Sequence, residues 1–151
     1  MKDNAPVLEL RPVIENLPAG FDALRTEARA EGYSFIERLA ADWEAHEMRF
    51  ERQGEALLAA HVTGELAGIG GLTIDPVLPG ALRMRRFYIR PPFRRLGIGR
   101  KLATALLERA RSTSGLVTVN VAPASVPFWE TLGFTPDRRD GHTHLRQLAA
   151  M

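Results

Sequence analysis

Hydrophobic and polar residues alternate along several stretches of the chain in the way that β-strands require. Residues 7–13 alternate in this manner, and residues 56–62 and 66–75 resemble a hairpin that turns at Gly64. Residues 82–89 alternate again, which places Met84, Arg86 and Tyr88 on one expected face. Residues 116–121 are rich in β-branched side chains, and residues 143–148 offer a last strand.

Other segments carry apolar residues at helical spacing. One helix is predicted from Phe21 to a stop near Gly32, and a second from a cap at Ser34 to roughly Phe50. The third has a buried stripe, and a short fourth helix over residues 125–132 ends before Gly133. The stripes of the second and third helices are Ile36, Leu39, Ala40, Trp43 and Phe50, and Ile98, Leu102, Ala105 and Leu106.

The resulting order is β-α-α-β-β-β-α-β-α-β-β, which predicts a mixed α/β sheet. A length of 151 residues without repeats or long linkers fits one domain over residues 1–151. No signal-peptide pattern or bilayer-spanning apolar run is present, and a cytoplasmic location is expected. The chain has no cysteine and its histidines form no ordered ligand pattern, so we expect no metal.

Positive charge is concentrated in one stretch. The net charge is only +2, but residues 83–101 contain eight cations and no acid. A local cationic site on an otherwise acidic chain indicates a specific polyanionic ligand. The eight are Arg83, Arg85, Arg86, Arg90, Arg94, Arg95, Arg100 and Lys101.

Gly97 and Gly99 lie where a predicted strand has ended and a helix begins. Unpaired N–H groups at a helix N-terminus attract an anion, and glycine lets phosphate approach the backbone. The segment fits neither the P-loop, because no Ser or Thr follows Lys101, nor the dinucleotide fingerprint, because Leu102 replaces the third glycine. A phosphate-bearing cofactor of another kind is therefore expected.

These residues resemble the GNAT N-acetyltransferases. "RRLGIG", residues 94–99, matches their [R/Q]-x-x-G-x-[G/A] acetyl-CoA signature, and "NVAPASVPFWETLGF", residues 120–134, is similar to their fifth strand and fourth helix. The resemblance covers residues 82–134 and implies the α/β (α+β) fold of these acetyltransferases. It consists of a mixed, mostly antiparallel sheet of about seven strands flanked by four helices, with strands 4 and 5 splayed.

The same resemblance implies acetyl-CoA as the acyl donor and names the residues that bind it. The pyrophosphate would lie on the turn, the pantetheine arm along the fourth strand, and further contacts would come from the fifth strand and fourth helix. These positions are Arg94, Arg95, Leu96, Gly97, Ile98, Gly99 and Arg100, then Phe87, Tyr88 and Ile89, then Asn120 and Phe128.

Two residues that usually move protons in this family are replaced here. The tyrosine that is often the general acid of the family is Trp129 here, and the usual glutamate of the fourth strand is Arg83. Glu47 falls within the apolar stripe of the second helix and is the candidate base or amine-binding anion, unless it lies at the end of a frayed or exposed turn or pairs with an arginine. Ser125 is a candidate contact for the leaving thiolate, or simply a helix cap.

Three readings remain open. The first is an acetyl-CoA-dependent N-acetyltransferase, in which an amine of a small molecule or protein attacks the thioester directly. The second is a non-catalytic acyl-CoA-binding or regulatory module that has lost the usual general acid. The third, nucleic-acid binding through the cationic stretch, is disfavoured because that stretch lies on a strand and its exit turn. No nucleic-acid or membrane partner is expected, and a homodimer is possible. The nine acids and five cations of residues 22–55 favour a cationic amine.

Overall fold

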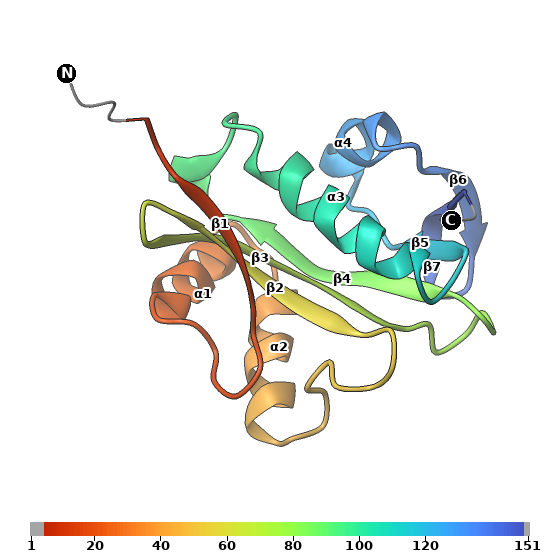
Figure 1. Cartoon of the computed structure of the whole chain (residues 1–151), viewed down its shortest axis with the longest axis horizontal. Helices are drawn as coiled ribbons and strands as arrows, with labels where there is room; N and C mark the ends of the chain where they lie inside the picture. The colour runs from red at the N-terminus through yellow and green to blue at the C-terminus, as the bar shows by residue number, and fades with distance from the viewer. Residues whose placement is uncertain (1–4, 150–151) are drawn as a thin grey trace.

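The structure is a computed structural model that describes residues 5–149. Its centre is a seven-stranded mixed sheet with the strand order β1-β2-β3-β4-β5-β7-β6 (Figure 1). The strands are β1 (Leu8–Pro12), β2 (Ala56–Val62), β3 (Glu65–Ile74), β4 (Leu82–Ile89), β5 (Leu116–Val119), β6 (Thr135–Arg139) and β7 (His142–Gln147). The helices are α1 (Phe21–Ala30), α2 (Phe35–Glu44), α3 (Ile98–Arg111) and α4 (Val126–Thr131), with 3-10 turns at Pro91–Phe93 and Pro123–Ser125.

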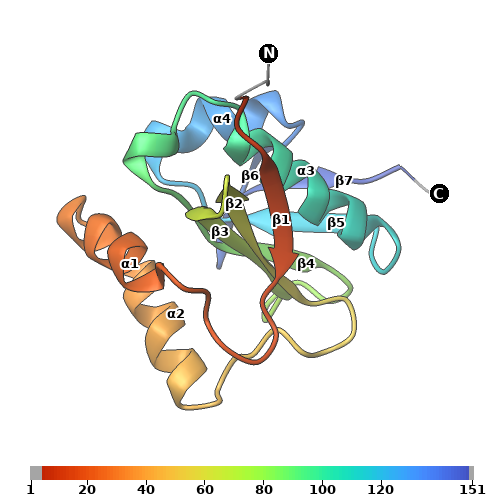
Figure 2. The same cartoon turned by 60° about the vertical axis from the view of Figure 1, so that its left-hand side comes forward.

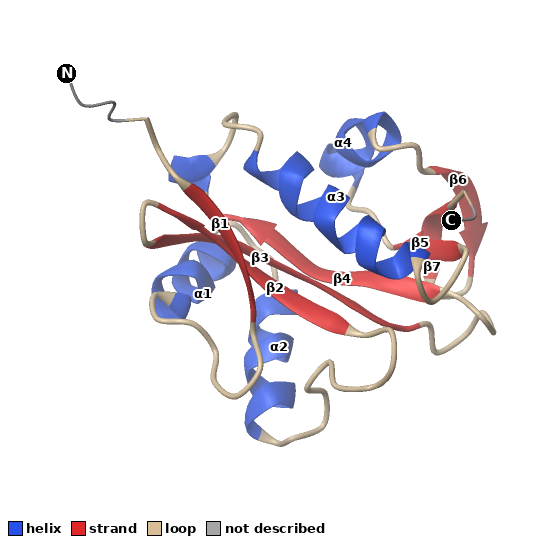
Figure 3. Ribbon diagram, in the orientation of Figure 1, coloured by secondary structure: helices blue, strands red, loops and turns tan. Residues whose placement is uncertain are grey.

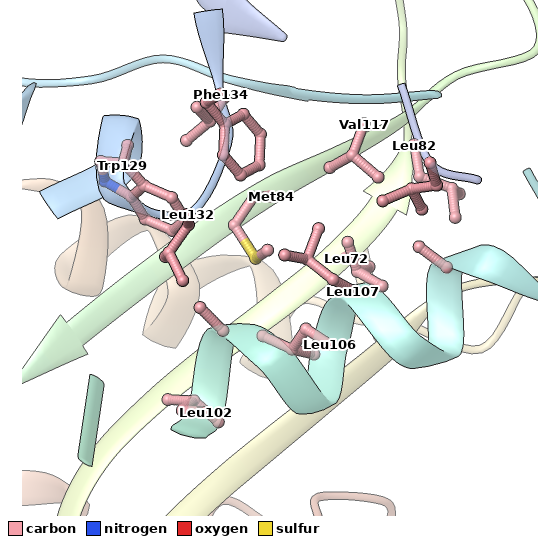
Figure 4. Packing of buried hydrophobic residues seen from close by; sticks show 14 of the residues in the cluster. Leu72, Leu82, Met84, Leu102, Leu106, Leu107, Val117, Trp129, Leu132 and Phe134 are labelled. Carbon is pink, nitrogen blue, oxygen red and sulfur yellow. The ribbon is translucent and has the colours of Figure 1, made fainter. Parts of the chain in front are cut away.

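The helices cover both faces of the sheet. Figures 1 and 2 show α1 and α2 against one face and α3 and α4 against the other. Each pair encloses a hydrophobic cluster, which for α3 and α4 is formed mainly around Met84, Leu102, Leu106 and Trp129 (Figure 4). The order of elements and the two-sided burial confirm the predicted fold class.

Local sequence accounts for the β2–β3 hairpin. Thr63 and Gly64 join the strands with φ angles of 48° and 84°. Two successive positive φ angles form a turn whose twist matches that of antiparallel strands. The hairpin predicted around Gly64 is confirmed.

A bulge interrupts β4 in its middle. Arg85 pairs with Gly71 and Tyr88 with Ile69, so Arg86 and Phe87 together face Gly70. Arg86 has a φ of 56°, an uncommon value for a residue with a side chain. The extra residue changes which face each later side chain occupies.

The predicted alternation of β4 is therefore wrong beyond the bulge. Met84 packs in the α3 cluster, whereas Tyr88 packs with α1 and α2. Phe87, expected opposite Met84, instead packs against the same cluster as Met84. A strict two-residue period cannot reveal this change of phase.

β4 and β5 are neighbours for only part of their length. They run parallel and pair through Leu82, Arg83 and Met84 of β4, and the rest of β4 continues without β5. Figure 3 shows β5, β6 and β7 gathered at one end of the sheet, while β4 extends away from them. The expected splaying of strands 4 and 5 is confirmed.

The second helix is shorter than predicted. It ends at Glu44 rather than near Phe50, and His46 then turns the chain with a φ of 58°. Arg49 donates a 2.8 Å hydrogen bond from Nε to the carbonyl of Trp43 and lies over its ring. Phe50 is still buried, but it reaches the core from the loop beyond the helix.

None of the helices within residues 5–149 has the length and apolar character needed to cross a membrane. The same residues contain no group of three or more His, Asp or Glu side chains arranged to hold a metal ion.

The bulge predicts a specific role for Gly70. A Cβ at this position would lie 2.6 Å from the Phe87 ring and 3.2 Å from Leu106. We expect Gly70→Ala to lower the free energy of unfolding by about 1–3 kcal/mol, because the Phe87 ring must move. Urea unfolding measures this change. Gly115→Ala, where a Cβ meets nothing within 4 Å, is the matched control, and equal stabilities of the two variants would contradict the prediction.

Candidate active site

A cleft of about 920 Å³ opens where β4 leaves β5. One wall is β4 from Arg83 to Ile89, and the other runs from Val119 to Trp129. The turn before α3 closes one end of the cleft, and Tyr33, Phe35 and Arg38 at the start of α2 border it as well. Most of the predicted site residues meet in this single cleft.

The turn before α3 has the geometry of an anion cradle. Gly97 is the N-cap of the helix with a φ of 78°, a conformation that glycine adopts without strain. The first helical N–H groups after it have no acceptor within the helix. A Cβ on Gly97 would meet nothing within 4 Å, and one on Gly99 would point at Ile89 and Phe128 at 3.4 Å. The cradle is thus open toward the cleft.

Two of the nearby arginines are available for an anion. Arg95 and Arg100 line the cleft, are exposed, and form no ion pair within the described residues. Ile98 is buried although it borders the cleft, and Leu96 is 59% exposed and lies outside the lining. Of the predicted turn residues, Leu96 alone is not brought to the cleft.

Arg94 has a different set of partners from those expected. Its guanidinium donates two hydrogen bonds to Glu31, of 2.9 and 2.6 Å, and a third to the carbonyl of Ile89. Arg94 thus borders the cleft while its charge is matched by a carboxylate at the end of α1. Arg90 is paired in the same way with Glu27, through bonds of 2.8 and 2.9 Å.

Tyr88 completes this network with its side chain. Its ring is buried among Tyr33 and Phe35, and its hydroxyl donates to Glu31. Burial is the main cause that raises the pKa of Tyr88, and the hydrogen bond to Glu31 adds to it. The hydroxyl of Tyr88 is therefore already occupied by Glu31.

Aromatic rings form the opposite wall. Phe128 lies 5.8 Å from Phe87 between ring centroids, and Trp129 lies 4.9 Å from Phe87 in an edge-to-face arrangement. Trp129 is buried and also packs on Phe134, so it is part of the core as well as of the wall. The residue at the position of the family tyrosine thus supports the wall by packing.

Two polar residues follow β5 in the cleft wall. Asn120 comes directly after the last residue of β5 and is exposed. Ser125 precedes α4 as its N-cap but forms no side-chain capping hydrogen bond. Its hydroxyl is therefore free to serve a ligand.

Glu47 does not share this location. It lies in the loop after α2, is exposed, and is not among the residues that line the cleft. The prediction that it lies within a buried helical stripe is wrong, because α2 ends three residues earlier. The acids of residues 22–55 are likewise outside the lining, and Glu27, Glu31 and Glu37 pair with arginines.

The cleft also contains residues that were not predicted as a site. Arg38, Arg85 and Arg86 line it, together with Tyr33 and Phe35. The cationic stretch of the sequence included Arg85 and Arg86, but nothing in it indicated that they face a helix from elsewhere in the chain. No sequence motif near Arg38 indicates that this residue lines the cleft.

The chain matches the family described as "Acetyltransferase (GNAT) domain" over residues 22–145, and it belongs to this family. It resembles a protein of Exiguobacterium sp. 255-15 classed as an acetyltransferase, with 22% identity over 93% of both chains and a TM-score of 0.85. It also resembles YncA of Salmonella typhimurium, classed as an acetyltransferase and solved with its cofactor acetyl-CoA, with 16% identity over 95% of both chains and a TM-score of 0.68.

A third similar structure is glucosamine-6-phosphate N-acetyltransferase from Arabidopsis thaliana. Its identity is 15% over 89% of this chain and 95% of that one, with a TM-score of 0.60. At these identities the structural neighbours establish the fold, and the family match establishes a GNAT acetyltransferase domain. Comparison with curated protein sequences gives no match.

The ion pairs that hold α1 against β4 predict a pH-dependent stability. Hydrogen bonds from Arg90 and Arg94 hold the pKa values of Glu27 and Glu31 below their usual range. The stabilisation is present above the ordinary glutamate pKa of about 4.3 and is lost as the pH falls through the lowered values.

We expect the Glu27→Gln, Glu31→Gln double variant to be less stable than the wild type by about 1–2 kcal/mol at pH 7, because both carboxylates are partly buried. The difference should shrink toward pH 3, as measured by urea unfolding at each pH. Glu108→Gln, in an exposed pair with Arg111, should have a much smaller effect. A constant difference from pH 7 to pH 3 would argue against these ion pairs.

Proposed function

We propose that the protein is an acetyl-CoA-dependent N-acetyltransferase. In this proposal an amine, on a small molecule or on a protein, attacks the thioester of acetyl-CoA directly. The parting of β4 from β5 beside an open, glycine-lined helix N-terminus is the observation that supports it best. A thioester cofactor with a pyrophosphate needs both a groove and an anion cradle, and the cleft offers them together.

The residues of the cleft fit the separate parts of acetyl-CoA. The pyrophosphate would lie on the backbone of Gly97 to Arg100, with Arg95 and Arg100 supplying charge. The pantetheine arm would run along Phe87 to Ile89, where β4 has no β5 partner for its peptide groups. Asn120 and Phe128 would flank the arm from the other wall, as the family resemblance predicts.

Acetyl-CoA would supply an activated acetyl group. The amine nitrogen forms a bond to the acetyl carbon, the carbon–sulfur bond breaks, and the nitrogen gives up one proton. Unpaired peptide N–H groups of β4 would polarise the carbonyl oxygen, and the free hydroxyl of Ser125 would donate to the departing sulfur. These roles need only groups that already face the cleft.

The proton of the amine has no obvious side-chain acceptor in the cleft. Among the lining residues, all of which belong to the described part of the chain, none is Asp, Glu or His. Water is therefore the proposed acceptor, and Glu47 is not assigned this role because of its position. Cytoplasmic location and homodimer formation stay predictions.

Two measurements test the function. Calorimetry should show binding of acetyl-CoA, and a free-thiol assay with a panel of amines should show release of CoA that depends on the amine. If acetyl-CoA binds but no amine raises thiol release above hydrolysis, the non-catalytic acyl-CoA-binding module becomes the better description. Calorimetry with DNA or RNA should show no binding.

The cradle gives a sharper prediction. Gly99→Asp should abolish acetyl-CoA binding, because its Cβ points into the cleft and the added carboxylate repels phosphate. The domain should stay folded, since the nearest atoms are 3.4 Å from that Cβ. Gly115→Asp, with open space around its Cβ, is the control for an added carboxylate. Calorimetry measures the affinity, and retained binding in Gly99→Asp would contradict the cradle assignment.

A further inference from the structure

Four arginines gather at the end of the cleft away from the glycine cradle. Arg83, Arg85 and Arg86 come from β4, and Arg38 comes from α2. Arg85 pairs with Gly71 and Ile89 with Gly68, so Arg85 lies three residues of β3, about 10 Å, along the strand from the cradle end. The cradle has its own cations, Arg95 and Arg100, so the proposed cofactor site does not account for this second group.

The β4 bulge places the three strand arginines on one face. Met84 points to the α3 side of the sheet, so its neighbours Arg83 and Arg85 point to the α2 side. The bulge then gives Arg86 the same direction as Arg85, and Arg86 reaches Asp42 of α2 at 3.3 Å. Arg85 and Arg86, whose side chains would alternate in a regular strand, thus point to the same side, and both line the cleft together with Arg38.

The carboxylates near these arginines do not satisfy them. Asp75 is 3.3 Å from Arg83, but it also accepts hydrogen bonds from the Thr118 hydroxyl and the backbone N–H groups of Val77 and Leu78. Arg83 is therefore one of four donors to a single carboxylate. Its Nε is buried and has no partner within the described residues.

Arg86 and Arg85 are even less well matched. Arg86 has a side chain only 7% exposed, its single ion pair with Asp42 is long, and its buried Nε has no partner among the described residues. Arg85, half-buried in the cleft wall, forms no hydrogen bond or ion pair with any residue from 5 to 149. Burial and the charge of Arg83 lower the pKa of Arg85, and burial and the charge of Arg85 lower that of Arg86. Arg83, Arg85 and Arg86 thus have two carboxylates among them, and Arg38 donates a 2.6 Å hydrogen bond to the hydroxyl of Ser34.

We propose that this group, the arginine end of the cleft, binds an anionic group of the acceptor, so that the substrate is a small amine carrying a carboxylate or a phosphate. This inference rests on the proposed N-acetyltransferase function. Arg85 supplies the main contact, because its fork of donors is unoccupied, and Arg38 of α2 lines the same cleft as a second cation. The amine then lies between the arginine end and the cofactor. The anion takes the place of the carboxylates that the cluster lacks.

The test uses pairs of amines that differ only in the anion. In the first kind of pair, a free amino acid is compared with its carboxamide. In the second, glucosamine 6-phosphate is compared with glucosamine. The thiol-release assay gives kcat and KM for each member. We expect the anionic member of at least one pair to have a kcat/KM at least about tenfold higher, the value of one charge-assisted hydrogen bond. The pair that shows the preference distinguishes carboxylate from phosphate.

Variants locate the effect. Arg85→Gln should raise KM for the anionic amine about tenfold or more while leaving the affinity for acetyl-CoA as in the wild type. Arg85→Lys should restore part of the loss, because it keeps the charge with a single donor group. Arg109→Gln, an exposed arginine on the far part of α3, is the matched control and should behave as the wild type. Thermal unfolding monitored by circular dichroism confirms that each variant is folded.

The results of these assays support or overturn the proposed anionic acceptor as follows. Equal or better use of the neutral amines by an active enzyme would overturn the anionic acceptor and leave the proposed function intact. Loss of acetyl-CoA affinity in Arg85→Gln would overturn it too, because the arginines would then serve the cofactor. If no amine is acetylated although acetyl-CoA binds, the proposed function fails. Calorimetric titration with the same amines then decides the inference. Anion-dependent binding that Arg85→Gln removes supports it, and its absence refutes it.

Discussion

The parting of β4 from β5 after Met84 is the constraint on which the rest of the site depends. Pairing between the two strands covers only Leu82 to Met84, and the bulge follows at once. Gly70 permits the bulge because a side chain there would meet the ring of Phe87. With Phe87 turned toward α3, the remainder of β4 becomes one wall of a cleft instead of an inner strand of the sheet. Gly70 on the neighbouring strand thus leaves the space that Phe87 occupies, and the bulge turns Arg86 to the same side as Arg85.

A second constraint holds the far end of β4 in place. Arg90 and Arg94 bind Glu27 and Glu31, and Tyr88 adds its hydroxyl to the same network. These bonds join α1 to the end of β4, so they fix the position at which the chain turns toward the glycine cradle. The arginines of the cationic stretch therefore fall into two groups with different partners. Arg90 and Arg94, which stabilise the wall, are matched by carboxylates, whereas Arg95 and Arg100 at one end of the cleft and Arg85 at the other form no ion pair among the described residues.

Features encoded by neighbouring residues could be predicted from the sequence, and features made by distant residues could not. The hairpin at Gly64, the order of elements and the glycine turn at Gly97 each follow from a short local pattern, and the structure contains all three. The end of α2 could not be predicted because Arg49 reaches back to Trp43 without any glycine as a signal. The pairing of Arg94 with Glu31 joins residues 63 positions apart. The error on Glu47 followed directly from the helix end, since a residue past the last turn no longer shares its stripe.

The lining of the cleft contains no side-chain base, but its positive charge makes the amine easier to deprotonate. An ammonium ion placed beside several guanidinium groups is disfavoured relative to the neutral amine, because a nearby like charge lowers its pKa. An acceptor held by its anion at the arginine end would pair with part of that charge and leave its amine facing the rest. The lining holds seven arginines and no Asp or Glu among the described residues. Carboxylates behind the lining pair with Arg83, Arg86 and Arg94, which leaves Arg85, Arg95, Arg100 and Arg38 as the charges that act on the amine. In the proposed mechanism the arginine end therefore does two things. It selects an anionic substrate, and it favours the neutral form of the amine that must attack the thioester.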